Sequence, residues 1–267
     1  QNALSYAKER KQGKANNSNN KDADLIIKHA DIRRSLMNMK SLIEGQRSLA
    51  FWVSQQIDVS LNHSNSTIKK NANDTVSMMT PLIKSFFTDI GMEITNDAIQ
   101  VFGGYGYTKD QGVEQLFRDN RITPIYEGTN SVQAIDLVFR KILNNNIYDN
   151  YIAQITKEIQ EYEKNKELAL FVQKFQKYVE LINNFTSWLI EKNKNSKDDV
   201  SAACNDYLKV LGYLGLAHSW LKILKVSYDK YDTNKSFFED KINTATYYFD
   251  KILPRAQSHY LLSLIHI

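Results

Sequence analysis

The chain has 267 residues, of which 42% are hydrophobic and 24% are charged, a balance typical of a globular protein rather than a disordered or collagen-like one. Its 34 basic and 30 acidic residues give a net charge of +4, too small an excess to predict nucleic-acid binding. No apolar run approaches the ~20 residues that a membrane-spanning helix needs. The single cysteine, Cys204, excludes an internal disulfide and a cysteine metal cluster, which favours a reducing compartment.

The first part of the chain predicts long helices. Three prolines, ten glycines and the absence of alternating strand patterns indicate an all-α fold. Apolar residues recur at three- and four-residue steps between Ile32 and Ile57, which predicts one long helix. Asp74 and Thr75 predict the cap of a second helix, which places Pro81 near a helix start, where a missing N–H is tolerated.

Glycines then divide the chain into shorter elements. The segment 96–102 either forms a third helix or continues the second, and the glycine-rich segment 103–106 ends it. A short helix is predicted around 113–118. Thr129 or Asn130 then caps the next helix.

A run of three asparagines is the best candidate for a domain boundary. It divides the chain into two predicted helical bundles, 1–146 and 147–267. About four amphipathic helices are expected in the second bundle, separated near 192–197 and 231–236. The apolar tail 261–267 is either a buried last turn or a non-native extension.

Several residues that could carry chemistry are better explained by structure. No histidine has metal-ligand spacing or a neighbouring nucleophile signature, so all five are expected at the surface or at helix caps: His29, His63, His218, His259 and His266. The three tryptophans occupy helical spacing and are expected in the core: Trp52, Trp188 and Trp220. The glycines of 103–106 follow a helix rather than a strand, which excludes a Rossmann dinucleotide loop. No metal site is predicted.

Three motifs lie in order between residues 96 and 130. They are the helix end Gln100-Val101-Phe102-Gly103-Gly104, the segment Arg118-Asp119-Asn120-Arg121-Ile122 and the loop Tyr126-Glu127-Gly128-Thr129. Together they closely resemble the acyl-CoA dehydrogenase family. The segment 6–13 resembles the start of that family's C-terminal helical domain. The resemblance is strong over residues 1–143 and mainly architectural beyond them.

The resemblance implies a fold and an activity. The chain would comprise the C-terminal helical bundle of the acyl-CoA dehydrogenase fold and a second bundle, as in a branch that includes enzymes acting on 3-methylmercaptopropionyl-CoA. The family desaturates acyl-CoA thioesters between the α and β carbons, with FAD as hydride acceptor and electron-transfer flavoprotein as oxidant. A homodimer or larger homo-oligomer and a cytoplasmic location are expected. The chain resembles the C-terminal half of such an enzyme and is expected to be inactive alone.

The resemblance also assigns roles to individual residues. Glu127 matches the base that removes the α-proton. Because an ordinary glutamate, with a pKa of ~4.3, is too weak for a carbon acid, this role requires a dry cleft that raises its pKa. The positions that match cofactor-binding residues are Arg10, Gln100, Gly103, Gly104, Gly128 and Thr129. Charged residues of the second motif (Arg118, Asp119 and Arg121) are expected to hold their loop through ion pairs.

Two alternatives stay open from the sequence. The first is a flavin enzyme of the same fold that uses oxygen, such as an acyl-CoA oxidase. The second is a non-catalytic helical scaffold, although retention of Glu127 and of the Gly103-Gly104 turn does not favour it. No residue can be assigned to recognition of a particular acyl chain.

Overall fold

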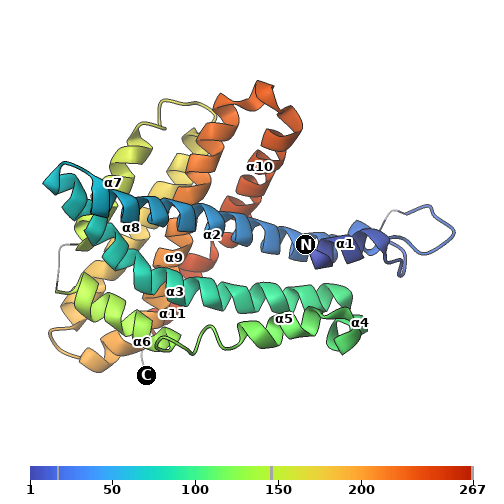
Figure 1. Ribbon diagram of the computed structural model, residues 1–267, viewed down its shortest axis with the longest axis horizontal. Helices are drawn as coiled ribbons and strands as arrows, with labels where there is room; N and C mark the ends of the chain where they lie inside the picture. The colour runs from blue at the N-terminus through green and yellow to red at the C-terminus, as the bar shows by residue number, and fades with distance from the viewer. Residues whose placement is uncertain (17, 145–146, 266–267) are drawn as a thin grey trace.

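A pair of long antiparallel helices, α2 (Ala30–Asn62) and α3 (Ser66–Phe102), runs through the computed structural model (Figure 1). The structure describes residues 1–16, 18–144 and 147–265. Within these ranges there is no strand, and the only β contact is an isolated bridge between Lys11 and Leu25. The predicted all-α fold is therefore confirmed.

The remaining elements are short in the first half of the chain and longer in the second. Before α2 lie α1 (Asn2–Glu9) and η1 (Ile26–Lys28), and after α3 follow α4 (Gly104–Tyr107), η2 (Lys109–Gln111), α5 (Val113–Asn120), α6 (Asn130–Ile135) and the π-helix η3 (Asp136–Ile142). The second half contains α7 (Ile147–Gln160), α8 (Ala169–Lys192), α9 (Lys197–Asp229), η4 (Tyr231–Thr233), α10 (Lys235–Tyr247), the π-helix η5 (Tyr248–Ile252) and α11 (Arg255–Ser263).

The predicted start of the second helix was wrong. The side chain of Asn65 caps α3, and its Oδ1 accepts hydrogen bonds from the backbone N–H groups of Thr67 and Ile68 at 2.9 and 3.1 Å. Thr75, expected at a cap together with Asp74, is buried inside the helix. Pro81 consequently lies in the helix interior, and segment 96–102 continues the same helix.

The separators predicted in the second half are confirmed, since α8, α9 and α10 end and begin within 192–197 and 229–235. Five α-helices occupy the described part of this half, one more than expected. The proposed boundary falls partly on residues 145–146, which lie outside the described residues, so the division into two bundles stays a prediction. In the tail, Leu261 and Leu262 are exposed, which contradicts a buried last turn there, and 266–267 are outside the described ranges.

Helix α9 is the centre of the main core. Its buried residues and those of α2, α3, α7, α8, η5 and α11 form one continuous cluster. Close packing depends on small residues. A Cβ at Gly212 would lie 2.5 Å from the ring of Phe86, and one at Gly215 would lie 3.2 Å from Leu49. Trp52 and Trp220 are buried as predicted, and Trp188 is partly buried.

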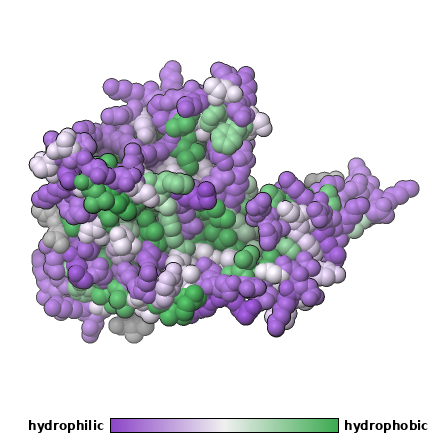
Figure 2. Space-filling view, in the orientation of Figure 1, coloured by the Kyte–Doolittle hydropathy of each residue, from purple (hydrophilic) through white to green (hydrophobic). Residues whose placement is uncertain are grey.

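The α2–α3 pair projects beyond the C-terminal helices as an arm that carries α1, α4 and α5 (Figures 1 and 2). A second, smaller core holds this arm together. Within it, Tyr6 of α1 stacks on Phe102 at the end of α3, with ring centroids 4.2 Å apart. This stacking fixes the residues that follow α1 beside the glycine turn that follows α3.

His218 contradicts the expectation that every histidine lies at the surface. It is 1% exposed, and its Nε2 lies 2.9 Å from Glu158 of α7. Burial lowers the pKa of His218, and its Nε2 N–H donates to the Glu158 carboxylate. Burial alone would raise the pKa of Glu158, but its interactions with His218 and Lys222 outweigh burial and lower the pKa to about 2. This buried polar network joins α7 to α9.

Candidate functional site

The loop with Glu127 has an unusual backbone. Glu127 has a φ of 56°, the only positive value among the described non-glycine residues, and Gly128 follows with a φ of 84°. Left-handed backbone is unfavourable for a residue with a side chain and persists where surrounding contacts hold it. One such contact is direct, because Nε2 of Gln133 donates a 2.8 Å hydrogen bond to the Glu127 carbonyl oxygen. Two consecutive residues of the loop, Glu127 and Gly128, therefore have positive φ, and the Glu127 side chain is exposed.

Two residues fasten this loop to the middle of α3. Nζ of Lys84 donates to the Gly128 carbonyl oxygen at 2.6 Å and to Oδ1 of Asn130 at 2.9 Å. Nδ2 of Asn130 donates to Oδ1 of Asp89 at 2.6 Å and lies within 3.1 Å of two further α3 acceptors. Every polar atom of the Asn130 amide therefore contacts α3, which sets the position of the neighbouring glutamate.

Thr129 is the N-cap residue of α6, as predicted, but its side chain makes no capping hydrogen bond. Asn130, the alternative cap, is instead the first helical residue and faces α3. The Thr129 residue is exposed, and so is Gly128. The loop therefore presents Glu127, Gly128 and Thr129 together on one accessible surface.

The other predicted residues gather at the far end of α3. Arg10, Gln100 and Gly103 line a hollow of about 350 Å³. The Arg10 guanidinium lies over the ring of Tyr105, 5.5 Å from its centroid. Gly103 ends α3 with φ 62° and ψ −141°, a positive φ outside the left-handed helical region, so the left-handed cap predicted for these glycines is not formed. The Gly103 N–H donates to the Gln100 carbonyl oxygen at 3.1 Å.

Space around the two adjacent glycines is open. A Cβ at Gly103 or Gly104 would meet no atom of this chain within 4 Å. The positive φ at position 103 explains why glycine is found there, whereas Gly104 has a conformation that any residue can adopt. Nothing within the chain explains a glycine at 104, so its bare backbone is available to an approaching group.

The structure therefore forms two groups rather than one site. Arg10, Gln100, Gly103 and Gly104 belong to the arm, whereas the loop with Glu127 is held to α3 by the contact of Lys84 with Gly128. At ~1.5 Å per residue, Lys84 and Gln100 are separated by about 24 Å along the helix. One chain does not bring the two groups into contact.

The charges of the second motif do not bind the loop as expected. Arg118 pairs with Glu114 of its own helix, with Nε and Oε2 2.9 Å apart. Across the described ranges, neither Asp119 nor Arg121 forms an ion pair. The loop is held by Lys84, Asn130 and Gln133 instead. Sequence reasoning missed these residues, since Lys84 and Gly128 are far apart in the chain and no motif links them.

Two classes of site were searched for in the described part of the chain. No group of three or more histidine, cysteine, aspartate or glutamate side chains there could hold a metal ion. None of the described helices combines the length and apolar character that a bilayer crossing requires.

Comparison with known proteins decides the family. Residues 1–143 match the family profile described as "Acyl-CoA dehydrogenase, C-terminal domain", which covers more than half of the chain. The chain belongs to the acyl-CoA dehydrogenase family. Residues 152–262 match a second profile, "Acetyl-CoA dehydrogenase C-terminal like", so the family relationship extends through the second half.

Similar proteins include two bacterial enzymes. The chain is 40% identical over 143 residues to 3-methylmercaptopropionyl-CoA dehydrogenase of Ruegeria pomeroyi, which covers 54% of this chain and 24% of that protein. It is 26% identical over 263 residues to butyryl-CoA dehydrogenase of Syntrophomonas wolfei, covering 94% of this chain and 42% of that protein. The chain thus spans less than half the length of these relatives.

A solved structure shows the same fold. The acyl-CoA dehydrogenase of Bacillus anthracis complexed with FAD superposes with a TM-score of 0.75 at 17% identity, over 98% of this chain and 45% of that one. The match includes both of the profile regions of this chain, 1–143 and 152–262. The helical arm, the Glu127 loop and the C-terminal helices therefore belong to one known architecture.

Proposed function

We propose that this chain is the C-terminal part of an FAD-dependent acyl-CoA dehydrogenase that desaturates an acyl-CoA thioester between its α and β carbons. The observation that carries the proposal is the conformation of Glu127. It is held with positive φ in a loop fastened to α3, within the region that matches the family. The backbone of Glu127 is strained and its carboxylate is exposed beside Gly128 and Thr129. Such an arrangement fits a side chain that acts on a bound group better than one that stabilises the fold.

Glu127 is the proposed base for the α-proton. In this chain its carboxylate is exposed, although abstraction of a proton from carbon needs a base with a raised pKa in a site without water. Large apolar side chains around it are also exposed: Ile122, Ile125, Tyr126 and Val132. Covering this apolar face would exclude water from Glu127 and raise its basicity. The isolated 267-residue chain is therefore expected to lack activity.

The residues of the arm fit the anionic half of FAD. The Arg10 guanidinium and the Gly103 turn border one hollow, and the open backbone at Gly104 permits close approach. FAD, when bound, supplies the hydride acceptor. Arg10 would contact its pyrophosphate, and Gln100, Gly103 and Gly104 would contact the adenosine half.

The separation of the two groups supports an assembly of several subunits. Gly128 and Thr129 would approach the flavin of one site, whereas Gln100 and the glycine turn, about 24 Å away along α3, would serve the site of a neighbouring subunit. A homodimer or larger homo-oligomer would then be required for complete sites. Electron-transfer flavoprotein is the proposed oxidant, and the cytoplasm the proposed location.

Similarity over residues 1–143 suggests a substrate within the family's range. The 40% identity to the Ruegeria enzyme favours 3-methylmercaptopropionyl-CoA as the first thioester to test. Butyryl-CoA is the natural comparison, because the similarity to the Syntrophomonas enzyme extends over 94% of the chain.

The test uses the full-length protein that contains this chain, loaded with FAD and mixed anaerobically with these and other thioesters. Loss of the oxidised-flavin absorbance would report substrate oxidation. Glu127→Gln should slow this bleaching by at least about 10²-fold while FAD stays bound. Glu161→Gln, at an exposed position of the second half, is the matched control and should bleach normally.

Other outcomes would redirect the assignment. An FAD-bound protein that no thioester bleaches would contradict the proposal and favour the scaffold alternative. Rapid reoxidation of the reduced flavin by oxygen, with product bound, would identify an oxidase.

A further inference from the structure

A groove of about 530 Å³ lies between α2, α9 and α10, and it shares no residue with the Glu127 loop or the Arg10 hollow. Its lining residues include four with large apolar side chains: Ile223, Val226, Phe237 and Phe238. Val226 is 48% exposed and Phe237 is 50% exposed, so half of each residue lacks cover. Exposed apolar side chains that line a concave surface are typical of a binding site.

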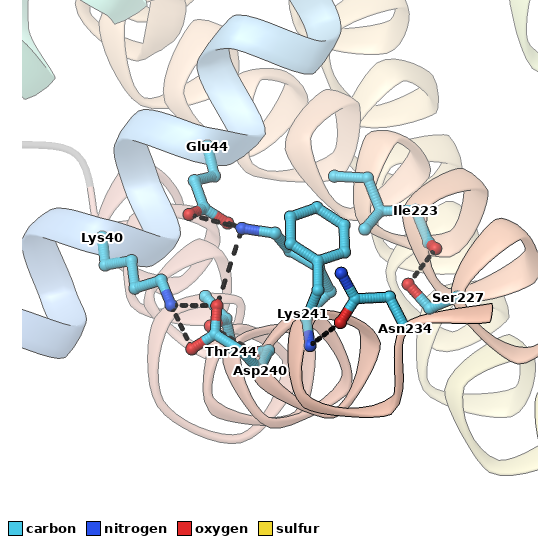
Figure 3. A network of polar contacts seen from close by, with 9 residues as sticks. Lys40, Glu44, Ile223, Ser227, Asn234, Asp240, Lys241 and Thr244 are labelled. Atoms are coloured by element: carbon cyan, nitrogen blue, oxygen red, sulfur yellow. Dashed lines mark hydrogen bonds and ion pairs between the residues drawn. The ribbon is translucent and has the colours of Figure 1, made fainter. Parts of the chain in front are cut away.

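The acidic side chains at this groove are already paired. Lys241 of α10 reaches both carboxylate oxygens of Glu44 on α2, at 2.8 and 2.9 Å (Figure 3). In the same view Lys40 of α2 contacts Asp240 of α10. Lys222 at the groove pairs with Glu158 of α7 at 3.2 Å. The contacts of Lys241 and Lys40 brace α10 against α2, and Lys241 and Lys222, the two lysines that line the groove, each pair with a glutamate.

Arg47 is the exception. It lines the groove one turn after Glu44, where a helical glutamate at this spacing would ordinarily pair with it. Both oxygens of Glu44 are held by Lys241 instead. The exposed Arg47 guanidinium therefore has no carboxylate partner among the residues that the structure describes.

We infer that this groove binds a small amphipathic monocarboxylate, whose carboxylate pairs with Arg47 and whose hydrocarbon body lies on Val226 and Phe237. A guanidinium matches a carboxylate with two parallel hydrogen bonds, which gives such a site its preference for this head group. The volume lies within the range of small-molecule pockets, ~300–1,000 Å³.

A protein partner fits this surface less well. Stable protein interfaces bury about 800 Å² on each partner. The groove offers only two large, exposed apolar side chains, Val226 and Phe237. The unpaired Arg47 guanidinium beside the small apolar surface of Val226 and Phe237 matches a ligand with one carboxylate and one short hydrocarbon chain.

The test is titration of the 267-residue chain with octanoate by calorimetry, with octanol and propionate as probes that lack the charge and the tail. Arg47→Gln should weaken octanoate binding at least tenfold, and Arg47→Lys should weaken it less, since the charge remains. Arg34→Gln, another exposed arginine of α2, is the matched control and should leave binding unchanged. Phe237→Ser should weaken octanoate while circular dichroism reports an intact fold.

The inference is overturned if Arg47→Gln binds octanoate as tightly as the native chain, or if octanol or propionate binds equally well. Dimerisation that is abolished in Arg47→Gln, without octanoate binding, would assign the groove to a second copy. Binding of an acidic helical peptide alone would assign it to a protein. Because no flavin or thioester is involved, failure here is distinguishable from failure of the proposed dehydrogenase activity.

Discussion

Replacing Gly212 by alanine should destabilise the fold because the new methyl group has no room. A Cβ at this position would lie 2.5 Å from two carbon atoms of the Phe86 ring. Phe86 is 1% exposed and meets Tyr213 edge to face, with centroids 5.0 Å apart, so the ring has no free direction to move. Overpacking of this kind costs about 3 kcal/mol at the upper end of its usual range.

Alanine also favours the helix, by about 1 kcal/mol relative to glycine. The net expectation for Gly212→Ala is a loss of about 2 kcal/mol in the free energy of unfolding. Gly215→Ala supplies the matched control in the same helix. Its Cβ would lie 3.2 Å from Cδ2 of Leu49, the mobile end of a side chain that can shift by a few tenths of an ångström. This variant should be close to neutral.

Urea unfolding followed by circular dichroism at 222 nm measures both variants against the native chain. The two free energies should differ by about 2 kcal/mol, with Gly212→Ala the less stable. Equal stabilities within about 0.5 kcal/mol would refute the argument that the α3–α9 contact depends on a glycine.

Three further changes test other contacts. Lys84→Met should lower stability by about 1 kcal/mol and speed amide exchange in the Glu127 loop several-fold, because the Gly128 carbonyl loses its donor, whereas Lys70→Met on the same helix should change neither. Asn65→Ala should cost about 1 kcal/mol in urea unfolding, since two N–H groups lose their cap, and an unchanged midpoint would contradict this role. The folded pKa of Glu158 lies below its unfolded value, so its contribution is complete above about pH 4.5 and is lost as pH falls toward 2; in acid titrations followed by fluorescence, Glu158→Gln should flatten that loss.

The apolar periodicity of the sequence was sufficient to predict α2, but it did not predict where α3 begins. The apolar steps between Ile32 and Ile57 correctly predicted a helix, although Ile43 and Ile57 are exposed and Leu42 and Leu49 form much of the buried face of α2. In α3 the first turns are mostly polar, and their one large apolar residue, Ile68, is exposed, so they lack the apolar pattern of a buried helix face. Pro81 reinforced the wrong start, although tertiary packing stabilises a helix that extends on both sides of it.

The sequence allowed candidate site residues to be proposed, but it did not predict their arrangement. The motifs identified Glu127 and the glycine turn, because short-range spacing carries them. The left-handed φ of Glu127 and the Lys84 contact depend on how α6 packs against α3, which no local pattern specifies. His218 was misjudged for the same reason, since its partner Glu158 lies on another helix.

The continuity of α3 fixes how the Glu127 loop and the Gly103 turn are placed relative to each other. The helix is unbroken from Ser66 to Phe102, so it acts as a spacer of fixed length and fixed phase between the Glu127 loop and the Gly103 turn. Inserting one residue between Asp89 and Gln100 would advance the far end by ~1.5 Å and rotate it by ~100°. Such a change would leave the residues of each group unaltered but change the distance and rotation between the two groups. Tolerance to substitution within this segment should therefore greatly exceed its tolerance to insertion or deletion.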